Sequence, residues 1–201
     1  MIIDTTRIAS MEKLQRVQFA TTLPGPKPIC LVGTRSAAGV ANLAPFSSIT
    51  HLGSDPLLIG MITRPDTVER HTLSNILATG SWTLNHVTSS TVHQAHQCSH
   101  RYPADVSEFE ATGLTELHHP GITAPFVAEC QIRMALELAE IIPIPSNGTR
   151  LIVGRVVLVE MPDDALSPDG SVDIAGHGSM ASTALDGYFT ISGHLRIALS
   201  R

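Results

Sequence analysis

Residues 39–50 combine small, hydroxyl and proline side chains in an order that suits the binding of a flat polar ring. The segment is Gly-Val-Ala-Asn-Leu-Ala-Pro-Phe-Ser-Ser-Ile-Thr. Because Pro45 has no backbone N–H, a strand that contains it is locally broken, and the freed backbone groups need other partners. The polar rim of a heteroaromatic ligand could supply them. An edge strand with a proline bulge explains the same residues, so both interpretations stay open at this point.

A second candidate segment, Arg64-Pro-Asp-Thr, stands at the start of a helical pattern. Asp66 has the side chain of an N-cap, and apolar residues recur at roughly helical spacing up to a stop at Gly80, which predicts a helix over residues 66–79. The unpaired N–H groups of this helix, the Thr67 hydroxyl and the Arg64 guanidinium would together suit a phosphate. The alternative is an ordinary capped helix whose arginine is solvated.

Histidine and cysteine side chains gather between residues 93 and 100, so a zinc or copper site must be considered. His93, His96, Cys98 and His100 are all of ligand type. However, no distant Cys-x-x-Cys pair or acidic partner at a familiar spacing completes the set. We therefore predict no metal site and interpret the segment as a polar helix near the mouth of the ligand site.

Familiar nucleotide and nucleophile motifs give no competing assignment. Residues 176–181 match a dinucleotide fingerprint as a string, but too few residues follow for the helix and parallel strand that the motif requires, so a loop is predicted. The sequence contains no P-loop string and no G-x-S-x-G context. We predict no catalytic side chain, which agrees with chemistry performed by a bound cofactor.

The elements that must position these residues are mainly short antiparallel strands. Apolar runs separated by Gly, Ser and Asp predict strands over residues 28–34, 40–50, 56–62 and 81–87, after a short helix around residues 8–17.

Residues 126–138 have strong helix propensity but alternate apolar and polar side chains with a period of two, which predicts a strand. An Asn147-Gly148 turn joins this strand to residues 151–161 in a long hairpin, and such hairpins favour a barrel.

Composition excludes several classes of function. The 201 residues suit one domain, residues 1–201, and the formal net charge of −5 without basic runs argues against binding to nucleic acid. No apolar stretch is long enough for a membrane span, and the start lacks the pattern of a signal peptide, so we expect a cytoplasmic protein. The cysteines Cys30, Cys98 and Cys130 are odd in number and are expected to be reduced and structural.

The candidate segments together resemble a known family. Asn42-Leu-Ala-Pro-Phe-Ser-Ser, Arg64-Pro-Asp-Thr and Asn75-Ile, followed by Thr79-Gly-Ser-Trp-Thr-Leu-Asn85, are similar in order and spacing to the flavin reductase-like family of FMN-binding split barrels. The resemblance implies a mainly β, antiparallel split β-barrel with flanking helices. It also implies noncovalent FMN, a homodimer with the flavin near the interface, and NAD(P)H-dependent reduction of a flavin or a related small acceptor. A monooxygenase is a possible partner for the reduced flavin.

Carried over residue by residue, the resemblance implies a cofactor-binding set. The ring and ribityl chain would be lined by Asn42, Ala44, Pro45, Phe46, Ser47 and Ser48. The phosphate would be held by Arg64, Asp66 and Thr67, and Asn85 would add a polar contact. Two departures from the family pattern are Pro65 after Arg64 and an aromatic content of only 4%, which leaves Phe46, Trp82 and Tyr188 as rings that could contact a flavin.

Two alternatives remain open. The first is an FMN-binding or electron-transfer protein without reductase turnover, which follows if a partner covers the second face of the flavin. The second is a metal-binding or structural β-barrel.

Overall fold

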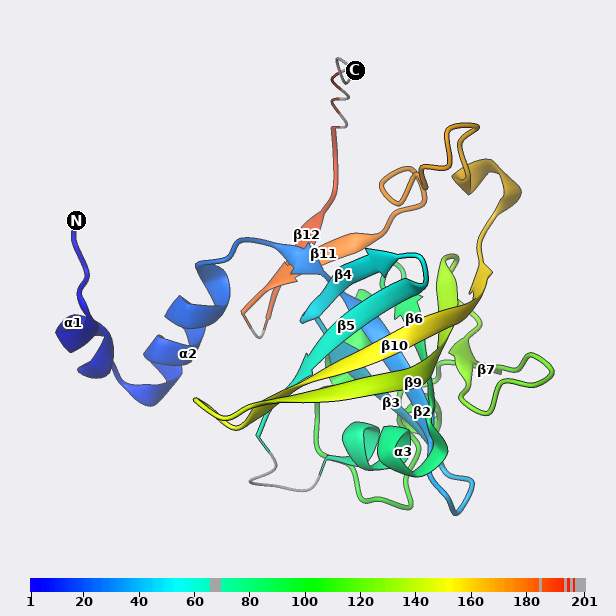
Figure 1. Cartoon of the computed structure of the whole chain (residues 1–201), viewed down its shortest axis with the longest axis horizontal. Coiled ribbons are helices and arrows are strands. Elements are labelled where there is room, and N and C mark those ends of the chain that lie inside the picture. The colour runs from blue at the N-terminus through cyan, green and yellow to red at the C-terminus, as the bar shows by residue number, and fades with distance from the viewer. Residues whose placement is uncertain (66–69, 185, 194, 196, 198–201) are drawn as a thin grey trace.

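The computed structural model describes residues 1–65, 70–184, 186–193, 195 and 197 (Figure 1). Within these ranges the strands outnumber the helices, and the chain is mainly antiparallel β-structure, as predicted. The strands are β1 (Lys27–Pro28), β2 (Cys30–Arg35), β3 (Ala41–Phe46), β4 (Ile49–Ser54), β5 (Leu57–Thr63), β6 (Ser81–His86), β7 (Glu116–Leu117), β8 (Phe126–Val127), β9 (Arg133–Ile144), β10 (Thr149–Glu160), β11 (Met180–Thr183) and β12 (Gly187–Thr190). The helices are α1 (Thr5–Ala9), α2 (Lys13–Thr22), α3 (His71–Thr79), α4 (Val92–Gln97) and α5 (Glu108–Thr112), with a 3₁₀ turn at Asp163–Ala165.

The main sheet is a barrel that is split at one place. Its seven strands have the order β3-β2-β6-β9-β10-β5-β4, and every neighbouring pair is antiparallel. The two edge strands, β3 and β4, are consecutive in the chain and are joined only by Ser47 and Ser48. The sheet must therefore curl until its edges meet at this link. Because β3 and β4 do not pair with each other, the barrel is open along this seam.

The seam corrects one strand boundary. We predicted a single strand over residues 40–50, broken at Pro45, whereas β3 continues through Pro45 to Phe46 and the break falls at Ser47 and Ser48. Pro45 is paired with Leu31 of β2, and the other side of β3 faces no strand. Proline is tolerated at such an edge because the missing N–H can point away from the ladder.

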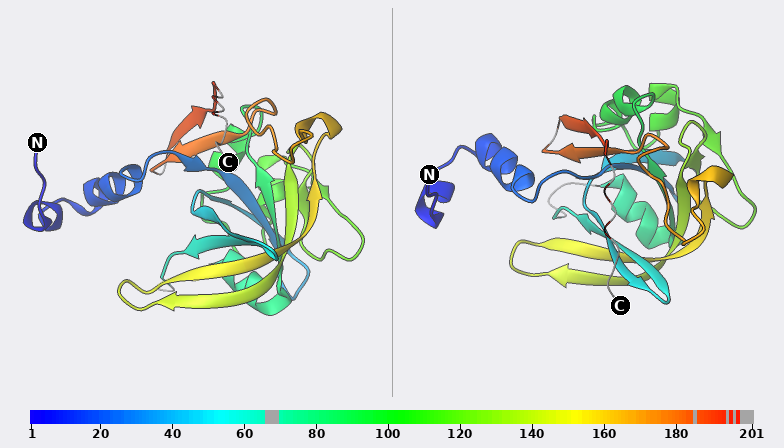
Figure 2. Two further views of the ribbon diagram at one scale, coloured as in Figure 1. Left: turned by 45° about the horizontal axis from the view of Figure 1, so that its top comes forward. Right: turned by 90° about the horizontal axis from the view of Figure 1, so that it is seen from above.

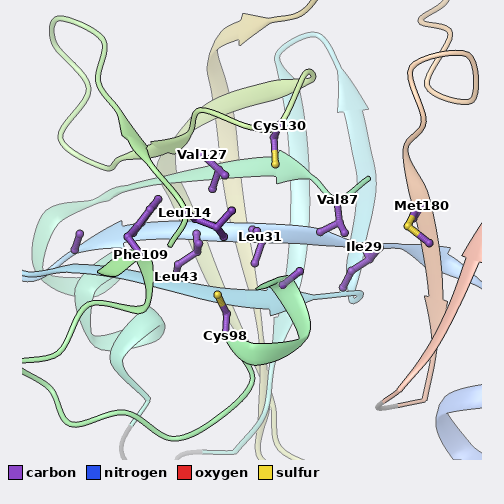
Figure 3. Close-up of a cluster of buried hydrophobic side chains, with 12 residues drawn as sticks. Ile29, Leu31, Leu43, Val87, Cys98, Phe109, Leu114, Val127, Cys130 and Met180 are labelled. Carbon is purple, nitrogen blue, oxygen red and sulfur yellow. The ribbon is translucent and has the colours of Figure 1, made fainter. Parts of the chain in front are cut away.

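Two apolar cores lie on opposite faces of β2, because successive side chains of a strand point to opposite sides. Ile29 and Leu31 pack into one core with Leu43, Phe109 and Val127, which Figure 3 shows. Cys30 and Val32 pack into the other core, whose remaining members come from β5, α3, β6, β9 and β10 and include Met61, Leu73, Ile76, Trp82, Leu84, Leu136 and Ile152. Since both faces are covered, β2 is buried along nearly its whole length.

The predicted hairpin is present, although its first strand begins at Arg133 instead of Phe126 and continues to Ile144. β9 and β10 have twelve residues each, pair with two register shifts along the ladder, and are joined by a turn at residues 145–148, where Gly148 has a φ of 73°. We predicted residues 126–132 as part of this strand, but they do not extend β9. After β8 the chain turns, with the Cys130 N–H donating to the Val127 carbonyl, and Arg133 Nη1 donates to the carbonyls of Val127 and Ala128. These local bonds compete with a continuous strand.

Two helix boundaries also differ from prediction. The predicted helix around residues 8–17 is two helices, α1 and α2, with a break at residues 10–12. The described part of the helix after β5 begins at His71 and ends at Gly80, which has a φ of 69° as a C-cap. Arg70 is extended, so the helix predicted over residues 66–79 is confirmed only from His71 onward. The residue before α3 is Arg70, and Asp66 itself lies outside the described residues.

A second, small sheet lies against one end of the barrel. Its order is β1-β11-β12, all antiparallel. The Met180 N–H donates to the carbonyl of Val87, just past β6, and the His86 Nδ1 lies 2.9 Å from the Ser179 hydroxyl. The small sheet is thus attached to the barrel through the end of β6.

The N-terminal helices lie outside both sheets. Figures 1 and 2 show α1 and α2 projecting away from the barrel, and neither helix has a buried residue. None of the helices in the described part of the chain is long and apolar enough to cross a bilayer.

Candidate functional site

A cavity of about 760 Å³ opens where the barrel seam faces the small sheet. Two walls enclose it. We call residues 44–48, 62–64 and 70–73, from β3, the seam, β5 and the start of α3, the barrel wall. We call Lys27, Ser182, Asp186, Tyr188 and residues 99–102 the small-sheet wall. A cavity of this size is within the range of about 300–1,000 Å³ that is typical of small-molecule sites.

Most of the predicted site residues meet in this cavity. It is lined by Asn42, Ala44, Pro45, Phe46, Ser47, Ser48 and Arg64. Asp66 and Thr67 lie outside the described residues. The link between the edge strands thus brings a segment near residue 45 and a segment near residue 64 to one space.

The seam offers backbone donors to a ligand. Ser48 is held in place because its hydroxyl donates to the Ile62 carbonyl at 2.7 Å and its carbonyl accepts from the Ile62 N–H at 3.1 Å. In the described part of the chain, no protein group accepts a hydrogen bond from the N–H of Ser47 or Ser48. Backbone groups without a protein partner beside a cavity can bind the polar edge of a ligand.

Asn42 ties the seam strand to its neighbours. Its Nδ2 donates to the hydroxyls of Thr34 on β2 and Thr72 on α3, at 3.3 and 3.2 Å, and Asn75 Nδ2 donates to the same Thr34 hydroxyl at 3.0 Å. This network fixes the first turn of α3 against β2 and β3. Asn42 is 6% exposed, so it borders the cavity mainly as a structural support.

The cavity has a basic lining in an acidic chain. Four basic side chains, Lys27, Arg64, Arg70 and Arg101, face two acidic ones, Glu108 and Asp186, while the whole chain has a formal net charge of −5. The first residues of α3 also line the cavity, and α3 begins without a side-chain cap, so the positive end of its dipole faces the same space. This arrangement favours an anionic ligand.

One acidic group of the lining is deeply buried. Glu108 is 5% exposed, and its Oε2 accepts a hydrogen bond of 2.8 Å from the Leu43 N–H on the outer edge of β3. Burial raises the pKa of this carboxyl, against the lowering effects of the Leu43 hydrogen bond and of nearby His71. The hydrogen bond replaces the strand partner that an edge strand lacks.

Comparison with known proteins identifies the family of this chain. The model of the flavin reductase like domain matches residues 25–176. The chain belongs to the flavin reductase-like domain family.

The solved structures that resemble it agree with that assignment. One, from Shewanella frigidimarina NCIMB 400, is described as a candidate flavin reductase with a split barrel domain; it is 40% identical over 100% of both chains, with a TM-score of 0.95. Nitrilotriacetate monooxygenase component B from Bacillus cereus is 23% identical over 98% of both chains, with a TM-score of 0.86. An FMN-binding protein from Thermus thermophilus, solved with bound 1-cyclohex-2-enone, is 20% identical over 86% of this chain and 90% of its own, with a TM-score of 0.72. The last two show the fold alone.

For a flavin reductase-like chain, two predicted residues lie in unexpected places. Asn85 is fully buried and does not line the cavity. Its Nδ2 donates to the Leu31 carbonyl and the Thr83 hydroxyl, and its Oδ1 accepts from the Val127 N–H, so it joins β6, β2 and β8. Trp82 is 1% exposed in the core, whereas Phe46 and Tyr188 reach the cavity.

The histidine-rich segment forms α4, as predicted for a polar helix, and its end reaches the cavity at His100 and Arg101. Among the described residues, no group of three or more His, Cys, Asp or Glu side chains is arranged to hold a metal ion. Cys30, Cys98 and Cys130 are free and buried.

The cavity also contains residues that the sequence did not single out. They are Lys27, Arg70, Tyr102, Glu108, Ser182 and Asp186, among others. Arg70 could have been found, because it follows Arg64 closely and precedes the helix. Lys27 and Ser182 could not, because they reach the cavity only through a sheet that joins opposite ends of the chain.

Proposed function

We propose that this chain binds FMN noncovalently in the cavity at the barrel seam and is an NAD(P)H-dependent oxidoreductase that reduces a flavin or a related small acceptor. The observation that carries the proposal is the open seam between β3 and β4, which exposes unpaired backbone donors at Ser47 and Ser48 beside a basic cavity. Family membership supports a flavin as the ligand, and the Thermus relative is described as FMN-binding.

The residues present fit the chemistry of FMN. Residues 44–48 form the side of the cavity that would contact the ring and ribityl chain, with Phe46 supplying an aromatic surface. Arg64, Arg70 and the uncapped start of α3 would hold the phosphate, since charge-assisted hydrogen bonds and a helix dipole both favour an anion. Asp66 and Thr67 are part of this proposal from the sequence alone. We leave Asn85 out because its hydrogen bonds are made within the core.

The protein's part in the reaction is binding and orientation. When bound, FMN supplies the hydride chemistry. The seam would fix one edge of the ring by backbone hydrogen bonds, and the Ser48–Ile62 bonds extend the β4–β5 ladder and hold the seam against β5. A ring held in this way leaves the rest of the cavity for a hydride donor or acceptor in close contact with it.

The direct test uses the purified protein, FMN and the two nicotinamide donors. We expect FMN titration to give saturable binding, seen as a change in flavin absorption and fluorescence, and the FMN-loaded protein to oxidise NADH or NADPH. Failure to bind added FMN would contradict the proposal.

A second candidate function is FMN binding or electron transfer without reductase turnover. The basic cavity supports flavin binding but does not by itself require a donor. Saturable FMN binding without oxidation of either nicotinamide would favour this function.

We further propose a homodimer, because the N-terminal helices lack a partner in the single chain. Leu14 and Leu23 are 64% and 67% exposed, and helices as short as α1 and α2 are marginal in water unless they pack against another surface. Sedimentation should give twice the monomer mass, and removal of residues 1–22 should weaken association. A monomer at all concentrations would contradict this.

A location in the cytoplasm and transfer of reduced flavin to a monooxygenase complete the proposal. The similarity to a monooxygenase component B is the motivation for the second part. Stimulation of a flavin-dependent monooxygenase by the purified protein would test it.

A further inference from the structure

Glu108 carries the one carboxyl group that is buried in the described part of the chain. It is the first residue of α5, and the next residue, Phe109, packs in the apolar core with Leu43 and Cys98 (Figure 3). Because the core holds Phe109, it also fixes the position of Glu108. The hydrogen bond from the Leu43 N–H does not require a carboxyl group, since a neutral amide oxygen would accept it equally. The cost of burying an ionisable group here therefore needs another reason.

One of the two carboxyl oxygens of Glu108 is open to the main cavity. Oε2 accepts the hydrogen bond from Leu43, whereas no described group donates to Oε1. Oε1 is also not among the side-chain atoms that are buried without a partner. Since Glu108 lines the cavity, this oxygen has access to the ligand space. Glu108 can therefore gain or lose a proton at Oε1 while Oε2 keeps its bond.

A second, smaller cavity adjoins the main one at Asn42 and His71, which line both. We call it the side cavity. It has a volume of about 150 Å³, and its lining residues are Ser36, Val40, Ala41, Asn42, His71, Ser74, Asn75, Ala104 and Val106. Ser74, Ala104 and Val106 are exposed, so the side cavity opens to solvent. A polar lining and this volume suit several water molecules.

His71 links the side cavity with Glu108. It is the first residue of α3, and its imidazole forms no hydrogen bond with a described residue. Burial raises the pKa of Glu108, and His71 is near enough to oppose this effect by its positive charge. An imidazole can accept a proton at one nitrogen and donate one at the other. His71 is therefore placed to pass protons between water in the side cavity and Glu108.

Other ionisable groups face Glu108 from the neighbouring elements. β3, against which α5 packs, has no titratable side chain. Cys98 on α4 lies near Glu108, but burial raises the pKa of its thiol to about 12, so it stays neutral. Glu110 on the same helix is exposed. The remaining titratable residues of the main cavity are Lys27, Arg64, Arg70, His100, Arg101, Tyr102, Asp186 and Tyr188. None of these lines the side cavity, so His71 is the titratable residue that the two cavities share.

Reduction of a bound flavin creates a use for a proton-accepting group at this place. When the C–H bond of a nicotinamide donor breaks, the electron pair and the hydrogen leave together as a hydride. The main cavity then gains one negative charge. A negative charge near a buried carboxylate favours the protonated form of that carboxylate. A proton taken from solvent would restore the original net charge of the cavity.

We propose that Glu108 takes up a solvent proton at Oε1 when the bound ring is reduced, and that His71 and the side cavity supply this proton. The donor is oxidised, the ring is reduced, and water is the source of the proton, so no further reactant is needed. On reoxidation the proton leaves Glu108 by the same path. This role rests on the proposed FMN site and adds to it a group that couples electron transfer to proton uptake.

The test measures the midpoint potential of bound FMN against pH at an electrode, so that no nicotinamide is required. The variants are Glu108→Gln, which keeps an acceptor for the Leu43 N–H, and His71→Asn. Their matched controls are Glu110→Gln and His93→Gln, which alter exposed residues outside both cavities. Infrared difference spectra between reduced and oxidised protein give a second readout, because a protonated carboxyl group has its own absorption band. FMN titration of each variant first establishes that the flavin is bound.

For the wild type we expect a pH range in which two protons accompany the two electrons. In this range the potential should change about twice as steeply with pH as in Glu108→Gln, where one proton does so. Reduction should raise a protonated-carboxyl band in the wild type and in both controls, but not in Glu108→Gln. His71→Asn should move the two-proton range to higher pH, because a positive charge that favours the carboxylate is lost.

Equal slopes in the wild type and Glu108→Gln, with FMN bound in both, would overturn the inference, because the second proton would then be held elsewhere. An unchanged pH range in His71→Asn would overturn the role of His71 and the side cavity. If Glu108→Gln fails to fold, the inference is supported by a carboxyl band that appears on reduction and shifts with His71→Asn, and it is overturned by the absence of that band. If wild-type protein does not bind FMN, the proposed function fails first and the inference fails with it.

Discussion

The two walls of the cavity differ in how they are supported. The barrel wall continues from β3, whose Leu43 is fully buried, and β3 is paired with β2, where Leu31 and Val32 are also fully buried. In the small sheet, β11 contributes partly apolar buried residues, but no residue of β12 is buried, and Phe189 is 44% exposed. The barrel wall is therefore backed by an apolar core, whereas in the small sheet only β11 contributes buried residues.

The barrel also has longer strands, and so longer hydrogen-bonded ladders, than the small sheet. The barrel strands range from six to twelve residues, whereas β1, β11 and β12 have two, four and four. Short strands with few buried contacts open locally at lower free-energy cost. We infer that the barrel wall fixes the position of the cofactor and that the small-sheet wall adapts to a second ligand. The following predictions test that division.

The largest expected difference lies in the cores behind the walls. Leu43→Ala should lower the free energy of unfolding by about 2–5 kcal/mol, because it leaves a cavity in a fully buried core. Phe189→Ala should cost about 1 kcal/mol or less, since its side chain is nearly half exposed. Denaturant unfolding measures both. Equal losses would remove the contrast between the walls.

Lowering the pH should reduce the folding stability through His86, at the junction of the two sheets. Burial lowers the pKa of His86, which contacts Ser179, to about 4. Between pH 6.5 and 4 the unfolded chain takes up a proton that the folded chain does not, so stability falls as the pH falls through this window. At pH 4.5 this amounts to about 2–3 kcal/mol relative to pH 7.

The measurement for this prediction is denaturant unfolding at pH 7 and pH 4.5. His86→Gln should lose less stability on acidification than the wild type, and His93→Gln, which alters an exposed histidine on α4, should lose as much as the wild type. An identical loss in wild type and His86→Gln would contradict the assignment to this junction.

Arg64 tests the ligand assigned to the barrel wall. Arg64→Ala should weaken FMN binding by roughly 1.5–3 kcal/mol, about 10- to 150-fold, because it removes a charge-assisted contact to the phosphate. Flavin fluorescence titration measures this affinity. Arg155→Ala on β10 is the control, since Arg155 is exposed and outside the cavity. Equal affinities in the two variants would remove Arg64 from the site.

The smallest predicted effect compares one serine in each wall. Ser48→Ala should lower stability by about 0.5–1.5 kcal/mol, because the bond from its hydroxyl to the Ile62 carbonyl on β5 is lost. Ser182→Ala removes no side-chain hydrogen bond between described residues and should cost less. Thermal unfolding of the two variants gives the comparison. A larger loss for Ser182→Ala would show that the small sheet is the more tightly supported wall.

Local sequence patterns predicted the structure correctly where the pattern lies within one strand or turn. The period of two identified β9, and Asn147-Gly148 identified its turn, because both signals depend on residues that are close in the chain. The same pattern failed at residues 126–132, where carbonyls are bonded by Arg133 rather than by a strand. Asn85 illustrates a related limit, because its hydrogen bonds are made within the core. An asparagine at the end of a strand has the same local signature whether it faces a ligand or joins three core strands.

By itself the sequence determined a mainly antiparallel β-structure, its family, and the two segments around Pro45 and Arg64 that meet at the cavity, because alternation, turn chemistry and short motifs are local properties. Only the tertiary structure decided where the barrel opens and what faces the opening. Strand order places β3 and β4 at the two edges, and pairing of β1 with β11 brings Lys27 to Ser182 across more than 150 residues of chain. Such pairings depend on the packing of distant segments, which no local pattern encodes.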